Sequence, residues 1–231
     1  MNPNPYPYLT REAALPAAAE RNRVLRNTYW LLALSMVPTV LGAWLGVATG
    51  LARAMTPGVS MIVFFAGAFG FMFAIERTKN SAAGVPVLLA FTFFMGVMLS
   101  RLVGAVLGLG NGAELIMTAF AGTGLIFFGM ASLSSIIKRD LSSMGKFLFI
   151  GAVMLMVAGI ANFFLQSSAL MLTLMVLAIG IFSAFILHDL KRVRDGYETN
   201  YISATLGVYL SLYNVFQSLL ALLGIFGGRD E

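Results

Sequence analysis

Residues 115–137 read LIMTAFAGTGLIFFGMASLSSII, a run of 23 residues without a charged side chain. A helix needs about 20 apolar residues to cross the hydrocarbon core of a bilayer, so this run is long enough for one membrane span. A strand of a membrane barrel would alternate polar and apolar residues, and this run does not alternate. The stretch therefore predicts a transmembrane helix.

The composition of the whole chain points the same way. Of its 231 residues, 59% are hydrophobic and 11% are charged, whereas soluble domains are about 45–50% apolar and about 25% charged. One water-soluble core of this length cannot hide so much apolar surface, which excludes an ordinary soluble domain. The chain has no cysteine and one histidine. Disulfides, cysteine nucleophiles and multi-histidine zinc sites are therefore excluded, and we expect no metal and no cofactor.

Six further apolar stretches accompany the first, and together they predict an all-α, polytopic bundle of seven transmembrane helices. The seven stretches lie at about Tyr29–Gly50, Val59–Ile75, Ala83–Leu107, Leu115–Ile137, Phe147–Leu165, Leu170–Leu187 and Ile202–Phe226. The polar, Pro-rich segment before them lacks the apolar surface needed to order itself and is expected to be a flexible tail. We therefore divide the chain into a tail, 1–27, and a membrane domain, 28–231.

Basic residues are distributed unequally between the two ends of these spans. Twelve of the 15 Lys and Arg residues lie in the tail and in the loops that follow the second, fourth and sixth spans. Two lie on the other side, and Arg101 lies inside the third span. Because loops rich in Lys and Arg stay in the cytoplasm, the N-terminus is expected inside the cell and the C-terminus outside it.

The seventh span carries a small and polar stripe on one face. At 100° per residue the members of this stripe fall within about 60° of one another, with Gln217 beside them and two tyrosines on the opposite face. Such a face belongs in the bundle interior, where Asn162 of the fifth span is a candidate partner. The stripe serves either hydrogen bonding between helices or a solvated ion path. Its members are Gly207, Ser211, Asn214 and Ser218.

Glycines repeat at intervals of four residues in two of the spans. Gly42, Gly46 and Gly50 share one face of the first span, and Gly104 and Gly108 share one face of the third. Small residues at this spacing let two helix backbones approach closely. They indicate packing within one bundle, with a dimer interface as the alternative.

Two ionisable residues, Arg101 and His188, lie within or beside the spans, where a charged side chain is costly. Arg101 is a gate or counter-ion in one interpretation; in the other it extends to the outer surface or pairs with Glu114. His188 closes the sixth span and is expected at the membrane surface. Ser183 lies about 140° from it around a helix, so the two do not form a nucleophile and base.

Motifs of metalloproteases, serine hydrolases and phosphate-binding loops are absent from the sequence, and we expect no enzyme activity.

Four segments together resemble the bacterial transmembrane Bax inhibitor motif family. They are FTFFMGVMLS (91–100), AFAGTGLIFFGMASLSSIIKRDLSSMGKFLFIG (119–151), HDLKRV (188–193) and VYLSLYNVFQSLLALLG (208–224). The resemblance extends from about residue 24 almost to the end of the chain. Within the family, Tyr209–Asn214 looks most like the YccA-type subgroup, the modulators of the membrane-bound, ATP-dependent protease FtsH. The resemblance implies a bacterial inner membrane protein with seven helices and the last helix near the centre.

Members of this family that leak calcium imply a further expectation. In them, one aspartate at the cytoplasmic end of the sixth helix and one within the seventh share a proton and gate the pore. They share it because two nearby carboxylates do not both ionise easily. The first position matches Asp189, whereas the second falls on Ser211, which does not ionise. Asp195 lies in the following loop and does not replace it. The candidate pH or ion site, Asp189 and Ser211, therefore lacks its carboxylate pair.

The missing carboxylate at Ser211 favours modulation of FtsH over a calcium leak. We expect a modulator of FtsH that acts as an inhibitor or competing substrate, with FtsH and the lipid bilayer as partners. A pH-sensitive calcium leak channel is the alternative, and a purely structural membrane partner is the third hypothesis. The polar tail would give the protease a chain end to engage, and the packed spans would resist extraction.

Overall fold

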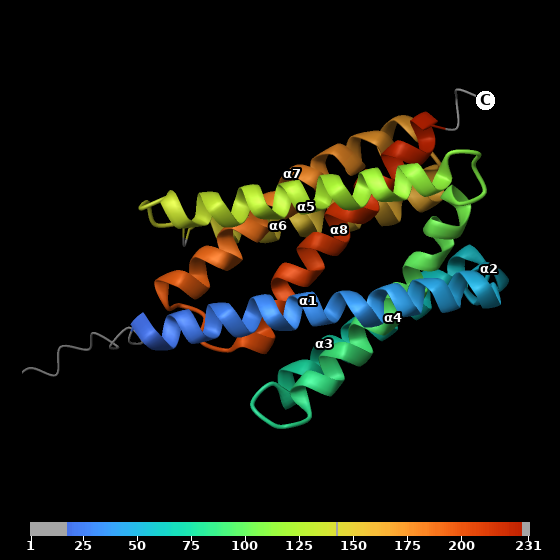
Figure 1. The fold of residues 1–231 in the computed structure, drawn as a ribbon. Helices are drawn as coiled ribbons and strands as arrows, with labels where there is room; N and C mark the ends of the chain where they lie inside the picture. The colour runs from blue at the N-terminus through green and yellow to red at the C-terminus, as the bar shows by residue number, and fades with distance from the viewer. Residues whose placement is uncertain (1–17, 142, 228–231) are drawn as a thin grey trace, which may run out of the picture.

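The computed structural model describes residues 18–141 and 143–227. In these ranges the regular structure is helical throughout, as Figure 1 shows. The helices are α1 (Ala18–Thr49), α2 (Leu51–Ala54), α3 (Pro57–Thr78), α4 (Gly84–Val106), α5 (Gly112–Ile136), α6 (Met144–Leu165), α7 (Ser168–Asp195) and α8 (Tyr201–Gly227). All except α2 are long and apolar enough to cross a membrane. The predicted bundle of seven spans is confirmed.

The first two spans differ in length from the predicted stretches. Helix α1 begins at Ala18, within the expected tail, because Val24 is buried against the end of α7 and the start of α8. Residues 1–17 of that tail lie outside the described residues. Helix α3 begins at Pro57 and is capped by Thr56, whose hydroxyl accepts a hydrogen bond from the Val59 N–H at 3.4 Å. Pro is well placed in a first helical turn because its missing N–H would have no partner there.

Helix α8 lies at the centre of the bundle. It packs against α1, α3 and α4 on one side and against α5 and α7 on the other. Figure 1 shows α8 running between these two groups, with α6 on the outside beside α7. The expectation that the last helix is central is confirmed.

The glycines of the first span hold α1 against α4. A Cβ atom on Gly42 would collide with the carbonyl oxygen of Phe93, and one on Gly46 would collide with the Ser100 side chain. From the other side, a Cβ atom on Gly96 would collide with the Thr39 carbonyl. The two backbones are therefore too close for any larger residue, as the predicted packing within one bundle requires.

The third glycine of that predicted face has another role. Gly50 has a φ of +66° and lies between α1 and α2, with nothing near the position of a Cβ atom. A left-handed conformation favours glycine because it has no Cβ atom to clash. In the third span, Gly104 is buried within α4, whereas Gly108 lies beyond the end of that helix.

The segments richest in basic residues gather at one end of the bundle. The start of α1 packs against the end of α7 and the start of α8. Asn200, before α8, donates a hydrogen bond of 3.1 Å to the carbonyl of Lys79, after α3. His188, near the end of α7, lies against Gly145 at the start of α6. We call this end of the molecule the basic end, and the other the opposite end.

The outer surface of the bundle is apolar. Helix α6 buries none of its residues, and α5 exposes Phe120, Leu125 and Phe128 by 64%, 75% and 68%. A soluble protein avoids so large an apolar surface, whereas lipid chains solvate it well. This chain is a multi-pass membrane protein.

Candidate functional site

Asp189 and His188 form a partly buried polar pair near the end of α7. The Nδ1 atom of His188 lies 3.1 Å from Oδ1 of Asp189, and their side chains are 8% and 19% exposed. His188 was expected at the membrane surface, but the structure buries its ring against α6. A Cβ atom on Gly145 would lie 2.7 Å from Nε2, so only a glycine leaves room for the ring. The His188 ring therefore packs α7 against α6.

The other oxygen of Asp189 faces α8. A Cβ atom on Gly207 would lie 2.8 Å from Oδ2, so the carboxylate rests against bare backbone. Ser211 lies one helical turn further along α8, is 3% exposed, and donates a hydrogen bond of 3.0 Å to the Gly207 carbonyl. Of the two predicted positions, Asp189 thus contacts α8 at Gly207, and Ser211 is buried one turn away on that helix. We call Asp189, His188, Gly207 and Ser211 the Asp189 site.

The sequence suggested that Asp195 lies in a loop, but it belongs to helix α7. It is the last residue of α7, and its carboxylate binds the Lys191 ammonium at 2.8 Å, one turn earlier on the same helix. Lys191 is only 6% exposed. This pairing commits Asp195 to the end of α7, so it does not supply a second carboxylate to the Asp189 site.

The other residues of the polar stripe bond mainly within their own segments. Asn214 donates to the Leu210 carbonyl at 2.8 Å, and Ser218 is buried on the same helix. Asn162, the candidate partner, accepts a hydrogen bond of 3.1 Å from the Ser167 N–H and so closes the turn between α6 and α7. Gln217 is exposed and lines a pocket together with Arg101. The structure therefore does not bring Asn162 to the stripe as a hydrogen-bond partner.

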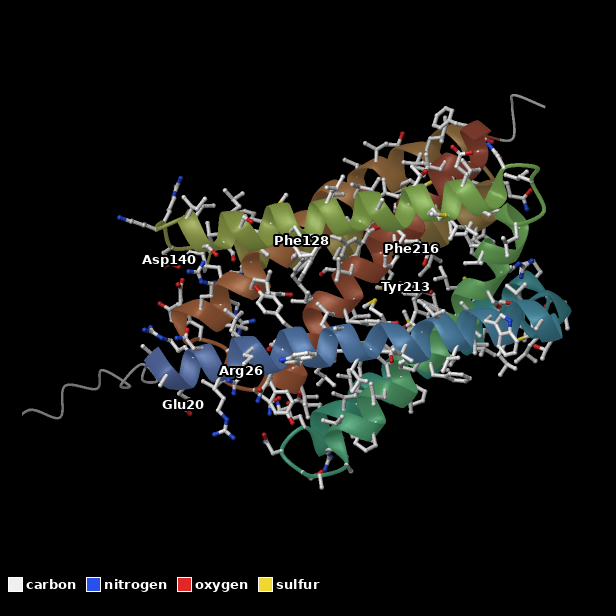
Figure 2. The ribbon with its side chains drawn as sticks, in the orientation of Figure 1. Glu20, Arg26, Phe128, Asp140, Tyr213 and Phe216 are labelled. Atoms are coloured by element: carbon white, nitrogen blue, oxygen red, sulfur yellow. The ribbon has the colours of Figure 1, made fainter. Side chains whose placement is uncertain are left out.

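The tyrosines on the opposite face of α8 do form hydrogen bonds to other helices. Tyr209 bonds to the Thr39 hydroxyl at 2.9 Å and donates to the Thr92 carbonyl at 3.4 Å. Tyr213 donates to the Met95 carbonyl at 3.3 Å. Figure 2 shows Tyr213 on α8 between α1 and α5. A buried tyrosine hydroxyl needs a partner, and this rule was the sequence signal that could have identified both residues.

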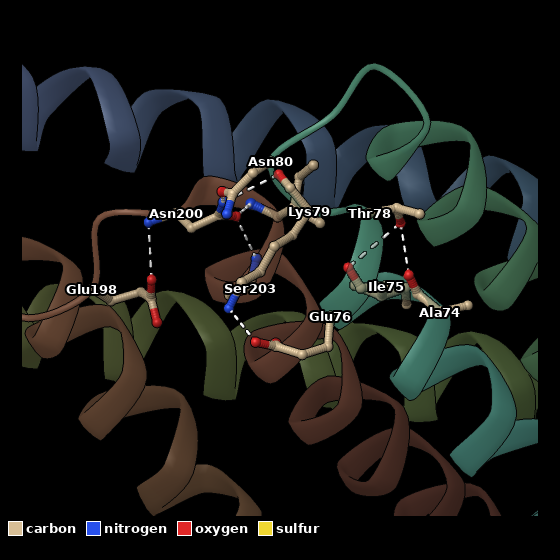
Figure 3. Close-up of polar contacts among 10 residues, drawn as sticks. Ala74, Ile75, Glu76, Thr78, Lys79, Asn80, Glu198, Asn200 and Ser203 are labelled. Carbon is tan, nitrogen blue, oxygen red and sulfur yellow. Dashed lines mark hydrogen bonds and ion pairs between the residues drawn. The ribbon is translucent and has the colours of Figure 1, made fainter.

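Asn200 is a second connection that the sequence did not reveal. Its side-chain oxygen accepts hydrogen bonds from the N–H groups of Ile202 and Ser203 and so caps α8. Its amide nitrogen donates to the Lys79 carbonyl at 3.1 Å and to Oδ1 of Asn80 at 2.8 Å (Figure 3). One side chain therefore fixes the start of α8 to the loop between α3 and α4.

Comparison with known proteins defines the family. The protein-family model described as "Inhibitor of apoptosis-promoting Bax1" matches residues 21–228 of this chain. The chain belongs to the Bax inhibitor family. "Modulator of FtsH protease YccA" from Escherichia coli (strain K12) is 37% identical over 209 residues, which cover 90% of this chain and 92% of that protein. An "Uncharacterized membrane protein" from Vibrio cholerae is 35% identical over 224 residues, which cover 97% of this chain and 99% of that protein.

In this Bax inhibitor family member, few side chains of the Asp189 site can carry a charge or bind a metal ion. Gly207 and Ser211 carry no ionisable group, and the hydroxyl of Ser211 already bonds to its own helix. Within the described residues, no group of three or more His, Asp or Glu side chains is arranged to hold a metal ion. Asp189 and His188 are thus the titratable residues of the Asp189 site.

Proposed function

We propose that this protein is an inner-membrane modulator of an FtsH-type protease and acts as a substrate that occupies the protease. The observation that carries the proposal is the similarity to the E. coli modulator of FtsH protease over 90% of this chain. The absence of a second carboxylate at Ser211 supports it, because it weakens the calcium leak alternative. The proposed activity needs no catalytic group and no cofactor.

The orientation of the chain is part of the proposal. An ATP-driven protease draws on cytoplasmic ATP, so it acts on the cytoplasmic side of the membrane. We place the basic end and the N-terminal tail on that side, since basic loops are retained there. The tail then lies where such a protease can engage it, directly before α1.

The packing of α1 explains why such a substrate would be hard to extract. Pulling from the N-terminus would have to remove α1 first. This helix is held against α4 at Gly42 and Gly96, and it is hydrogen-bonded to α8 through Thr39 and Tyr209. Closely packed backbones and hydrogen bonds between helices are the main forces that hold helices together in lipid. A protease engaged on the tail would therefore be occupied for a long time.

Modulation is tested by measuring a second substrate. In membrane vesicles with active FtsH and ATP, adding this protein should lengthen the half-life of an unrelated FtsH substrate in proportion to the amount added. Competition for one protease requires this dependence. The matched control is a different seven-helix protein at the same density, which should have no effect. An unchanged half-life of the reporter at a molar excess of this protein would contradict the proposal.

The alternative, a pH-gated calcium leak, rests on Asp189. Ser211→Asp would place a carboxylate four residues, or about 6 Å, along α8 from the glycine that faces Asp189. Like charges at this spacing couple and raise one of the two pKa values. We expect calcium flux into dye-loaded liposomes to be small and independent of pH near neutrality for the unmodified protein, and to depend on pH in this variant.

Ser218→Asp is the matched control for this experiment. It introduces the same charge on the same stripe, two turns further from Asp189, and should not create the pH dependence. Strong pH-gated calcium flux through the unmodified protein would favour the leak channel over modulation of FtsH.

A further inference from the structure

A pocket of about 470 Å³ opens at the opposite end of the bundle, between α3, α4 and α8. Its polar side carries Arg101, Ser60 and Gln217, and its apolar side includes Met55, Met61 and Met98. The volume lies in the range of about 300–1,000 Å³ that is usual for small-molecule sites. Methionine side chains adapt to flexible apolar ligands. The pocket thus combines a cationic group with an adaptable apolar wall.

Arg101 carries a charge inside a membrane span. It lies five residues before the end of α4 at Val106, or about 7–8 Å along the helix axis. Its guanidinium donates one hydrogen bond of 3.3 Å to the Ser60 hydroxyl. Among the described residues the ion pairs do not include Arg101, so the expected pairing with Glu114 is not formed. Arg101 is exposed, and a charge at this depth is costly unless its side chain reaches the interface or an anion lies beside it.

The surroundings of Arg101 favour an anion. Ser60 lies in the first turn of α3, where the helix dipole adds partial positive charge. Gln217 is exposed to the pocket and supplies amide donors. Guanidinium, hydroxyl and amide groups are common ligands of phosphate oxygens.

We infer that this pocket binds an anionic phospholipid of the adjacent leaflet. The lipid phosphate lies against Arg101, Ser60 and Gln217, and an acyl chain lies along the methionine wall. The depth of Arg101 fits this arrangement, because the headgroup region extends about 5–7 Å beyond the hydrocarbon core on each side. The inference does not depend on the proposed modulation of FtsH.

The test measures lipid binding to the full-length purified protein by native mass spectrometry. The protein in detergent is titrated with phosphatidylglycerol or with phosphatidylcholine, which carries a compensating positive charge. The unmodified protein should retain phosphatidylglycerol in preference. Arg101→Gln should weaken this binding about five- to ten-fold, and Arg101→Lys should preserve most of it.

Arg77→Gln is the charge-matched control. Arg77 lies at the other end of α3, with its guanidinium 5.0 Å from the centre of the Phe73 ring. Its loss should leave the first bound phosphatidylglycerol unchanged. An equal loss in both variants, or equal retention of the two lipids, would overturn the inference. If Arg101→Gln does not fold, Ser60→Ala should still lower the retention of phosphatidylglycerol, and no change there would overturn it as well.

Two other occupants are separate outcomes of the same experiment. Complete displacement of phosphatidylglycerol by millimolar inorganic phosphate would identify a site for free anions and contradict lipid occupancy. Retention of a second copy of the chain, lost in Arg101→Gln without any change in bound lipid, would identify a protein interface and also contradict it.

Discussion

Gly96→Ala is expected to destabilise the bundle by about 1–3 kcal/mol, which is the usual cost of forcing a methyl group into a closely packed interior. The new Cβ atom would collide with the Thr39 carbonyl, so α1 and α4 would have to separate. This expectation opposes helix propensity, because alanine favours a helix over glycine by about 1 kcal/mol. The free energy of unfolding of the purified protein in mixed micelles measures the effect.

Gly124→Ala is the matched control for this substitution. Gly124 lies within α5, and nothing is near the position of its Cβ atom. Alanine there should be neutral or slightly stabilising. If extraction of α1 limits degradation, Gly96→Ala should also be degraded faster by FtsH than the unmodified protein. Equal free energies of unfolding for the two alanine variants would show that the contact between α1 and α4 does not limit stability.

Deletion of residues 2–17 is expected to lengthen the half-life of the protein severalfold in membranes with active FtsH. This deletion ends before Ala18, so it leaves α1 and its contacts intact. If the protease engages the polar segment first, its removal slows the first step of degradation. The measurement is the half-life of the full-length and shortened proteins at matched expression.

A replacement variant separates the length of the tail from its sequence. A Gly/Ser segment of the same length forms a flexible chain without a specific structure. It should restore degradation if the protease needs only a chain end. Equal half-lives of the full-length and shortened proteins would reject engagement through the tail and would favour docking through the spans.

The spans were predictable because lipid requires long apolar helices with satisfied backbones, and this requirement is visible in the sequence alone. The glycine spacing likewise predicted a close contact, since Gly42 and Gly46 lack any side chain to keep another helix away. The partner helix was not predictable. That α4 supplies Phe93 and Ser100 to this contact depends on how distant segments meet, which hydropathy does not encode.

The candidate site was predictable in position but not in its bonds. Asp189 lies against Gly207 of α8, and Ser211 lies one turn further along the same helix. Serine and asparagine in a helix often bond to the carbonyl four residues earlier, and Ser211 and Asn214 do so. Tyr209 and Tyr213, whose face had been assigned no function, instead bond α8 to α1 and α4.

The central position of α8 makes the order of synthesis important for assembly. Thr39 and Tyr209, which bond to each other, are 170 residues apart. At about 5–20 residues per second, the ribosome needs about 10–30 s to make the chain between them. During this interval the earlier spans are in the membrane without the helix that joins their two groups. The nascent protein is thus an open assembly until its last span enters the bilayer, and quality-control factors have this period in which to bind it.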